Sequence, residues 1–358
     1  MPSPYVQERS TENYRDAFQV KLTRSAILRP VPEPESDELW AQNCASDYMV
    51  TCQWTVEGGW EVPEIKPFDN FSISPLASCL HYATQCFEGM KAFRGLDGNV
   101  RLFRPYRNAK RLAMSAKCVS LPQFDADYLV WLIEKLLQMD IDSSQCPPGA
   151  SPRSSMRLIT SQVDKIRAWP GGFGYAKVGA NYGPSFSLHH EAQAANYDQV
   201  LWLFGPEGRV TEVGARNFFA IVRNRESGLL ELLTALTEDK LILEGVTRNS
   251  VIQLVRSRLA DELEVIESYF TIQYLKTALE EGRLLEAFVS GTAFFIKPVS
   301  VIRCDNEDFN LPQKENSTIK NFTSLIKTWL YDIMFGKEEY SWSRIVERDL
   351  GDFKLFSP

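Results

Sequence analysis

The sequence has few histidines, no closely paired cysteines and no long apolar run. Histidine occurs three times in 358 residues, at His81, His189 and His190, so we expect no metal site. The seven cysteines include no Cys-x-x-Cys pair, which is typical of scattered, reduced thiols. The densest apolar run, at 129–133, is far shorter than the roughly twenty residues of a membrane helix.

The sequence also has no excess of positive charge. The chain carries 39 basic and 46 acidic residues, a formal net charge of −7. This balance argues against a broad nucleic-acid-binding surface, because such surfaces normally have an excess of basic residues. The first thirty residues lack the apolar centre of a secretory signal and hold too many acids for a good mitochondrial presequence. We therefore expect a cytoplasmic protein that binds neither nucleic acid nor membrane.

The length of the chain favours two domains. Residues 1–38 are polar and contain closely spaced prolines, which predicts an N-terminal arm. After Met139 the residues become small, polar and proline-bearing, which indicates a linker. We expect a small domain over 39–150, an interdomain linker over 151–170 and a large domain over 171–358, in an α+β fold.

Apolar periodicity predicts the main elements. A helix with regularly spaced leucines follows a cap at Asp125 or Asp127. Two further helices with one apolar face are expected at about 248–262 and 319–335. The expected strands are 49–54, 71–73, 100–103, a hairpin of 200–204 with 210–212, and 218–222.

Lys177 is the single charged side chain between Arg167 and Glu191, among five glycines and several aromatic rings. Most lone lysines lie on solvated faces, and that remains one interpretation. A lysine surrounded by glycine and aromatic residues is different, because burial disfavours the ammonium and lowers its pKa. A neutral amine is what a Schiff base with an aldehyde cofactor such as pyridoxal phosphate requires.

Three other segments could serve such a cofactor. Glu212 follows the hairpin, where an acid that faces inward is costly unless it is paired. Residues 245–247, Gly-Val-Thr, precede a helix whose first amides could bind an anion. Residues 290–293, Ser-Gly-Thr-Ala, lie between two apolar strands, as a phosphate-binding turn would. Each segment also has an ordinary interpretation, as a surface acid, a helix cap and a turn.

Seven motifs follow one another along the chain between about Tyr48 and Val346: HYATQCFEGMKAFRG, RLFRPYRNAKRL, KVGANYGPS, VTEVGARNFF, LEGVTR, SGTA and FGKEEYSW. With these motifs in this order, the sequence resembles the branched-chain amino-acid aminotransferases. The resemblance implies the two-domain, fold-type-IV architecture of pyridoxal-phosphate enzymes, similar to D-amino-acid aminotransferase.

The resemblance implies a role for each matching residue. Lys177 would bond the aldehyde of pyridoxal 5′-phosphate and act as the catalytic base, Glu212 would hold the pyridine nitrogen, and Tyr182 would lie beside the phenolic oxygen. The phosphate would be held by Arg111, Val246, Thr247 and Thr292, and the substrate would meet Tyr82, Phe87, Lys91 and Ala293.

The reaction that the resemblance implies is transamination of leucine, isoleucine or valine, or a related analogue, with 2-oxoglutarate to give 2-oxo acids and glutamate. It also implies a homodimer with residues of both subunits near the pocket. Two alternatives remain: a cofactor-binding relative with impaired catalysis, and a lyase of the same fold.

The chain departs from the family pattern in several places. Relatives have more residues between Met139 and the Ile-Arg-Ala-Trp segment at 166–169, so we expect a shortened small domain. The missing stretch carries, in relatives, a tyrosine and an arginine close to the active site. Substrate-side positions also differ, which suits an altered amino acid in a specialised pathway such as toxin synthesis. The positions that differ are Ala215, Arg216, Glu244, Phe294 and Phe295.

Overall fold

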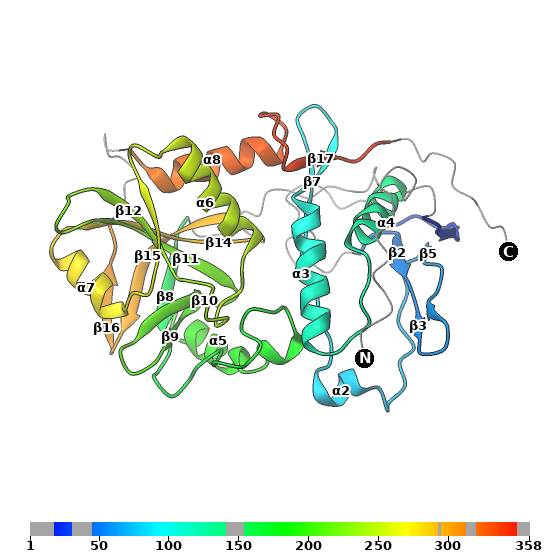
Figure 1. Cartoon of the computed structure of the whole chain (residues 1–358), viewed down its shortest axis with the longest axis horizontal. Coiled ribbons are helices and arrows are strands. Elements are labelled where there is room, and N and C mark those ends of the chain that lie inside the picture. Colours follow the sequence, from blue (N-terminus) through cyan, green and yellow to red (C-terminus); the bar gives the residue numbers. More distant parts are fainter. Residues whose placement is uncertain (1–17, 31–44, 141–153, 293–294, 313–319, 349–358) are drawn as a thin grey trace, which may run out of the picture.

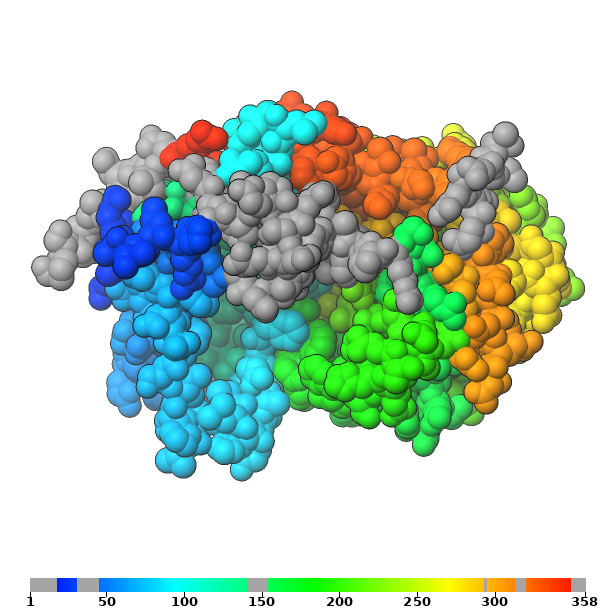
Figure 2. Space-filling view, turned by 180° about the vertical axis from the view of Figure 1, so that it is seen from behind, coloured from blue at the N-terminus to red at the C-terminus, as the bar shows by residue number. Residues whose placement is uncertain are grey.

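Two lobes lie side by side, with helix α3 (Pro105–Cys118) at their boundary (Figure 1). The computed structural model describes residues 18–30, 45–140, 154–292, 295–312 and 320–348. Seen from behind, the smaller lobe contains the N-terminal part of the chain and the larger lobe most of the C-terminal part (Figure 2). In the described ranges, none of the helices is long and apolar enough to cross a bilayer.

The larger lobe is built on a nine-stranded sheet in the order β10-β9-β8-β15-β14-β11-β12-β13, with β16 paired to β15. Strand β10 also pairs with β11, so six of the strands close into a ring. The strands are β8 (Met156–Thr160), β9 (Gln199–Phe204), β10 (Arg209–Val213), β11 (Arg216–Arg223), β12 (Leu230–Thr234), β13 (Glu264–Glu267), β14 (Leu284–Gly291), β15 (Phe295–Cys304) and β16 (Glu307–Asn310).

Helices cover this sheet on different sides because its strands are apolar on both faces. Helices α6 (Val246–Arg258) and α8 (Phe322–Met334) pack on the face that carries the stacked rings of Phe219 and Phe288. Helix α7 (Ile272–Glu280) packs on the opposite face. Helix α5 (Ser185–Ala194) covers Val200 and Trp202 of β9.

Among the residues that the structure describes, the smaller lobe contains short sheets and three helices. Helix α4 (Ala126–Met139) packs beside α3, and of the two expected caps Asp125 is the one observed: its Oδ1 accepts hydrogen bonds from the amides of Asp127 (2.7 Å) and Tyr128 (3.0 Å). The remaining elements are β1 (Lys21–Leu22), β2 (Tyr48–Thr51), β3 (Trp54–Thr55), β4 (Gly59–Trp60), β5 (Glu64–Pro67), α2 (Ser78–Tyr82), β6 (Ala92–Arg94) and β7 (Val100–Phe103).

The expected boundaries differ from the structure in three places. The stretch 151–170, expected as a linker, contributes β8, which lies between β15 and β9 because Met156 and Leu158 are buried in the core. Strand β17 (Ser343–Ile345), from the region expected to be the large domain, pairs with β7 in the smaller lobe. Residues 71–73 form no strand. Phe71 and Ile73 follow the alternating apolar pattern of a strand, but both side chains are exposed and no described strand pairs with this segment.

Strand β17 is fastened to the smaller lobe by side chains as well as by backbone. Val346 is buried with Val100 and Leu102. Arg344 forms an ion pair with Glu134 of α4, 210 residues earlier in the chain. The smaller lobe therefore includes residues from two distant parts of the sequence.

Asp140, which ends α4, makes stability depend on pH. Burial, together with the nearby Asp47 carboxylate, raises the pKa of Asp140 to about 6 from 3.8. Between these values the folded state binds more protons than the unfolded chain, so stability falls as the pH rises through this window. With solvent screening allowed for, we expect the free energy of unfolding of the wild type to fall by on the order of 2 kcal/mol between pH 4 and pH 7. Asp140→Asn, which has no carboxyl group at this position, is expected not to show this decrease.

Urea unfolding at several pH values between 4 and 7 measures this effect. The matched control is Asp164→Asn, at an exposed aspartate in a turn, which keeps the pH dependence of the wild type. The same slope in wild type and Asp140→Asn would contradict the assignment.

Candidate active site

A cavity of about 370 Å³ is lined mainly by the larger lobe, with Gly89 from the segment after α2 also in its wall. Its wall includes Lys177, from the glycine-rich segment that precedes α5, and Trp202 of β9. The turn between β10 and β11 and the turn after β14, including Thr292, complete it. Lys177, Tyr182 and Thr292, three of the expected site residues, therefore share one cavity.

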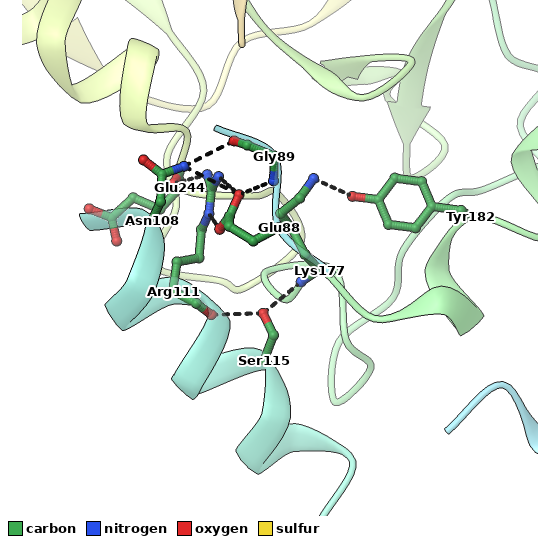
Figure 3. Close-up of polar contacts among 8 residues, drawn as sticks. All are labelled: Glu88, Gly89, Asn108, Arg111, Ser115, Lys177, Tyr182 and Glu244. Carbon is green, nitrogen blue, oxygen red and sulfur yellow. Dashed lines mark hydrogen bonds and ion pairs between the residues drawn. The ribbon is translucent and has the colours of Figure 1, made fainter. Parts of the chain in front are cut away.

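The backbone of Lys177 is held by the smaller lobe. Its amide donates a hydrogen bond to Oγ of Ser115 on α3 (2.9 Å), and the Ser115 hydroxyl in turn donates to the carbonyl oxygen of Arg111 (2.9 Å) (Figure 3). The carbonyl oxygen of Lys177 accepts from the amide of Phe87 (3.0 Å). Two segments far apart in the sequence thus fix the position of this lysine.

The amino group of Lys177 lies in a desolvated, aromatic environment. Nζ is 3.3 Å from the hydroxyl oxygen of Tyr182, to which it donates, and 4.4 Å from the centre of the Phe87 ring. Burial lowers the pKa of Lys177 and the nearby Arg111 lowers it further, whereas Glu88 and Glu212 oppose this shift. The neutral amine, which is the nucleophilic form, is therefore favoured relative to a solvent-exposed lysine.

Tyr182 packs edge-on against Phe87, with the ring centres 4.9 Å apart. Burial raises the pKa of Tyr182 to about 12, and the negative charge of Glu212 adds to this. Its phenol consequently stays protonated at neutral pH and can donate a hydrogen bond to an acceptor in the cavity.

Glu212 is a buried acid on β10 with 2% of its surface exposed. One oxygen accepts a hydrogen bond from the amide of Leu243 (2.8 Å), and the other forms an ion pair with Arg167. Burial raises the pKa of Glu212, and the Arg167 cation opposes that increase. An acid with a raised pKa and a fixed position is suited to sharing a proton with a nitrogen base.

Arg167 was missed in the sequence analysis as a site residue. Besides its ion pair, it donates to the carbonyl oxygens of Gly174 (3.0 Å) and Leu241 (3.1 Å). A signal for it existed, because an inward-facing acid such as Glu212 requires a buried cation, and Arg167 begins the glycine-rich segment.

The start of α6 is pressed against the same strands. Asn217 lies opposite Glu212 in the hairpin, and its Nδ2 donates to the carbonyl oxygen of Leu243 (2.9 Å). A Cβ on Gly245, the residue before α6, would be 2.2 Å from Oδ1 of Asn217, so this close approach requires glycine. In the described part of the chain, no side chain caps the helix at Gly245. Its first amides are thus open to a ligand.

Val246, Thr247 and Thr292 meet around a small cavity of about 20 Å³ beside the larger one. Thr292 lines both cavities, so they are adjacent. Lys91 also lines the small cavity rather than the large one. The structure therefore brings together three of the four residues expected to hold phosphate.

Arg111, the fourth, pairs with Glu88, which the sequence analysis did not single out. The guanidinium contacts both carboxylate oxygens, at 2.8 and 2.7 Å, and donates to the carbonyl oxygen of Glu244 (3.1 Å). This places the guanidinium beside the residues that lead into α6 (Figure 3).

Other expected residues lie elsewhere. Tyr82 ends α2 with 77% of its surface exposed and does not line either described cavity. Ala293 and Phe294 fall outside the described residues. Two of the departures from the family pattern, Ala215 and Arg216, do line the large cavity.

Comparison with known proteins identifies the family. A family model described as amino-transferase class IV matches residues 138–302. The cytosolic branched-chain-amino-acid aminotransferase of Saccharomyces cerevisiae is 36% identical over 369 positions, which cover 92% of this chain and 97% of that protein. The cytosolic enzyme of Mus musculus is 36% identical, with 95% and 97% covered.

Solved structures share the fold. The branched-chain aminotransferase of Thermoproteus uzoniensis, solved with norvaline, has a TM-score of 0.61 and 26% identity, covering 77% of this chain and 94% of that one. The Escherichia coli enzyme has a TM-score of 0.64 at 22% identity, covering 85% and 100%, which shows the fold alone. The expected α+β, fold-type-IV architecture is thereby confirmed.

The yeast alignment also bears on the shortened segment. The alignment has 369 positions but includes only 92% of the 358 residues of this chain. Some residues of the yeast protein are therefore aligned with gaps in this chain. This agrees with an internal shortening. Class IV aminotransferases depend on pyridoxal 5′-phosphate, which is the cofactor expected from the sequence. With a relative 36% identical over nearly its whole length, the chain belongs to the branched-chain-amino-acid aminotransferase family and is a transferase.

Proposed function

We propose that this enzyme transfers the amino group of leucine, isoleucine, valine or a close analogue to 2-oxoglutarate, giving the 2-oxo acid and glutamate. The observation that carries the proposal is the amine of Lys177, whose pKa is lowered by burial. It lies in a cavity whose wall also holds Arg167, the ion-pair partner of the buried acid Glu212. The family supports it through relatives whose names specify branched-chain amino acids.

The donor groups fit pyridoxal 5′-phosphate. A pyridine nitrogen requires an acid, a phenolic oxygen requires a donor, and a phosphate requires amides, hydroxyls and a cation. Because Gly245 has no side chain, the start of α6 can lie close to Asn217 of the sheet, and the first amides of the helix stay beside the sheet. The residues that would hold the cofactor are Glu212 at the ring nitrogen, Tyr182 at the phenolic oxygen, and Val246, Thr247, Thr292 and Arg111 at the phosphate.

When bound, the cofactor supplies an electron sink for the negative charge that develops at the substrate Cα. Lys177 Nζ accepts the proton from that carbon, as its lowered pKa favours the neutral amine. Glu212, held by Arg167 and the Leu243 amide, would keep a proton at the ring nitrogen of the bound cofactor. The Tyr182 hydroxyl, 3.3 Å from Nζ, orients the amine between these groups.

The cavity wall accounts for an aliphatic substrate. Phe186, Val200, Trp202 and Ala215 give it an apolar side. Burying a methylene group there contributes roughly 1–3 kcal/mol to discrimination between side chains. Such a wall favours leucine, isoleucine and valine over small polar amino acids.

We also infer that the enzyme is a homodimer. The stretch from Phe71 to Tyr82 exposes large apolar side chains, of which Leu76 is 90% and Tyr82 77% exposed. A second copy of the chain would cover them and bring Tyr82 to the partner's cavity. This explains how a residue expected to face substrate can lie outside the described cavities of its own chain.

The first prediction concerns Lys177. The purified wild type is expected to show the visible absorption band of lysine-bound cofactor, and borohydride reduction is expected to label the peptide containing Lys177. Lys177→Ala abolishes the band, the label and the conversion of leucine, because Lys177 is the one lysine among the described residues that line the cavity. Lys165→Ala, at a lysine paired with Glu191 on the surface, is the matched control and keeps all three.

The same measurement separates the alternatives. A band that leucine does not change would support a cofactor-binding relative without turnover. Release of ammonia or another elimination product would support a lyase. Turnover in Lys177→Ala would refute the assignment of this residue.

The second prediction concerns the start of α6. Gly245→Ala places a methyl group against Asn217 and pushes the helix amides away from the sheet. We expect the cofactor dissociation constant to rise about tenfold or more, a loss of at least ~1.4 kcal/mol. Gly183→Ala, where a Cβ meets open space, is the control. Absorbance titration of apoenzyme with cofactor measures both, and equal affinities would contradict the role of this turn.

The third prediction tests the dimer through complementation. Lys177→Ala and Tyr82→Ala are each expected to be poorly active alone. Refolded together, they form mixed dimers in which one site has both Lys177 and the partner's tyrosine, so the mixture regains about a quarter of wild-type activity. Light scattering checks the dimer mass. A monomeric wild type, or a mixture with no recovery, would contradict the proposal.

A further inference from the structure

Three cationic side chains line the active-site cavity among the residues that the structure describes. Lys177 is the amine assigned to the chemistry. Arg167 is ion-paired with Glu212 and donates to two backbone carbonyl groups. The third is Arg216, the first residue of β11, to which neither the chemistry nor the cofactor assigns a task.

The fold fixes Arg216 in place. It pairs with Val213 across the hairpin, and the amide of Gly214 in the turn donates to the carbonyl oxygen of Val200 (2.8 Å). A Cβ on Gly291 would lie 3.1 Å from Cγ of Arg216, so the stem of the arginine passes directly over this glycine. Gly291 precedes Thr292, and both line the cavity. The arginine is therefore anchored at the cavity wall rather than on a mobile surface.

The charges around Arg216 favour an anion in the cavity. Asp198 is the acid that faces it, and the Asp198 carboxylate is already fixed by the amide of Arg157 (2.7 Å). Lys297 is a second cation close enough to Arg216 for the charge of Arg216 to lower the pKa of Lys297, which burial lowers most. His189 of α5 lines the cavity, where burial lowers its pKa and the charge of Arg216 adds to the shift. Arg216 lines the cavity and Asp198 does not, so Arg216 brings a positive charge to the cavity wall.

A substrate of this enzyme brings at least one carboxylate, since amino acids and 2-oxo acids both carry one. A guanidinium binds a carboxylate through two parallel hydrogen bonds, which fixes the orientation as well as the affinity. The apolar residues Val200 and Trp202 lie in the same wall and can accept an aliphatic side chain. We propose that Arg216 binds a carboxylate of the substrate and so sets which acids the pocket accepts.

The proposal rests on the transamination proposed above. The carboxylate has two sources within that reaction. One is the α-carboxylate, which every substrate carries, and the other is the second carboxylate of 2-oxoglutarate or glutamate. Carboxylate-bearing and carboxylate-free probes distinguish them.

The test uses the holoenzyme as wild type, Arg216→Met, Arg216→Lys and Arg225→Met. Arg225 is an exposed arginine paired with Glu281, beyond the opposite end of β11, and serves as the matched control. Kinetics with leucine and with 2-oxoglutarate give kcat and KM. Calorimetry gives the dissociation constants of two unreactive acids, 4-methylpentanoate and glutarate. 3-Methylbutylamine, which is leucine without its carboxylate, reports on the rest of the pocket.

Binding of the α-carboxylate predicts a specific pattern. Arg216→Met raises the KM for leucine and the dissociation constant of 4-methylpentanoate about 10- to 100-fold, as expected for a lost charged hydrogen-bond pair. The kcat changes much less, the amine is processed as by wild type, and Arg216→Lys recovers part of the loss. If instead Arg216→Met raises only the KM for 2-oxoglutarate and the dissociation constant of glutarate, the inference holds, and the ligand of Arg216 is the second carboxylate.

Two results would overturn the inference. One is that Arg216→Met and Arg225→Met give the same constants with every probe. The other is that Arg216→Met impairs the reaction of 3-methylbutylamine as much as the binding of the acids, which indicates a purely structural role. Failure of the proposed function gives a different result. A wild type that binds 4-methylpentanoate through Arg216 but does not convert leucine contradicts the proposed transamination and leaves the role of Arg216 in place.

Discussion

The buried ion pair between Glu212 and Arg167 is the interaction on which the site depends. Through Arg167 the pair reaches the carbonyl of Gly174, in the segment that carries Lys177, and that of Leu241. Through Glu212 it reaches the amide of Leu243, two residues before the turn into α6. Breaking a buried pair by removing one partner typically costs about 3–5 kcal/mol. One charge pair thus joins the segment of the reactive amine to the expected phosphate site.

The site also requires both lobes. The larger lobe supplies the amine, the acid and the helix start, but the backbone of Lys177 is bonded to Ser115 and Phe87 of the smaller lobe. A shortened small domain is therefore compatible with the site as long as α3 and the segment before β6 remain. These are the parts of the smaller lobe that the structure retains beside Lys177.

Local sequence patterns were sufficient for much of the fold. The strand 100–103 is confirmed as β7, where all four residues are buried, and the helix cap at Asp125 follows from local hydrogen bonding. Strand β8 was missed because proline and serine precede it and its burial comes from distant strands. For the same reason Ser115 and Asn217 could not be assigned, since their partners lie in distant segments of the chain. Arg167 was missed although the inward-facing acid Glu212 called for a buried cation. Of the candidate residues that motifs marked, six line the two adjacent cavities: Lys177, Tyr182, Thr292, Lys91, Val246 and Thr247. Glu212, Phe87 and Arg111 line neither, Tyr82 is exposed, and Ala293 falls outside the described residues.

The return of β17 to the smaller lobe has a consequence for biosynthesis. During translation the strands β6 and β7 leave the ribosome early, but their third partner and the Arg344–Glu134 contact arrive only after the larger lobe has been made. Until then β7 presents an open edge that can pair with other nascent chains. The lobe encoded first is accordingly completed last.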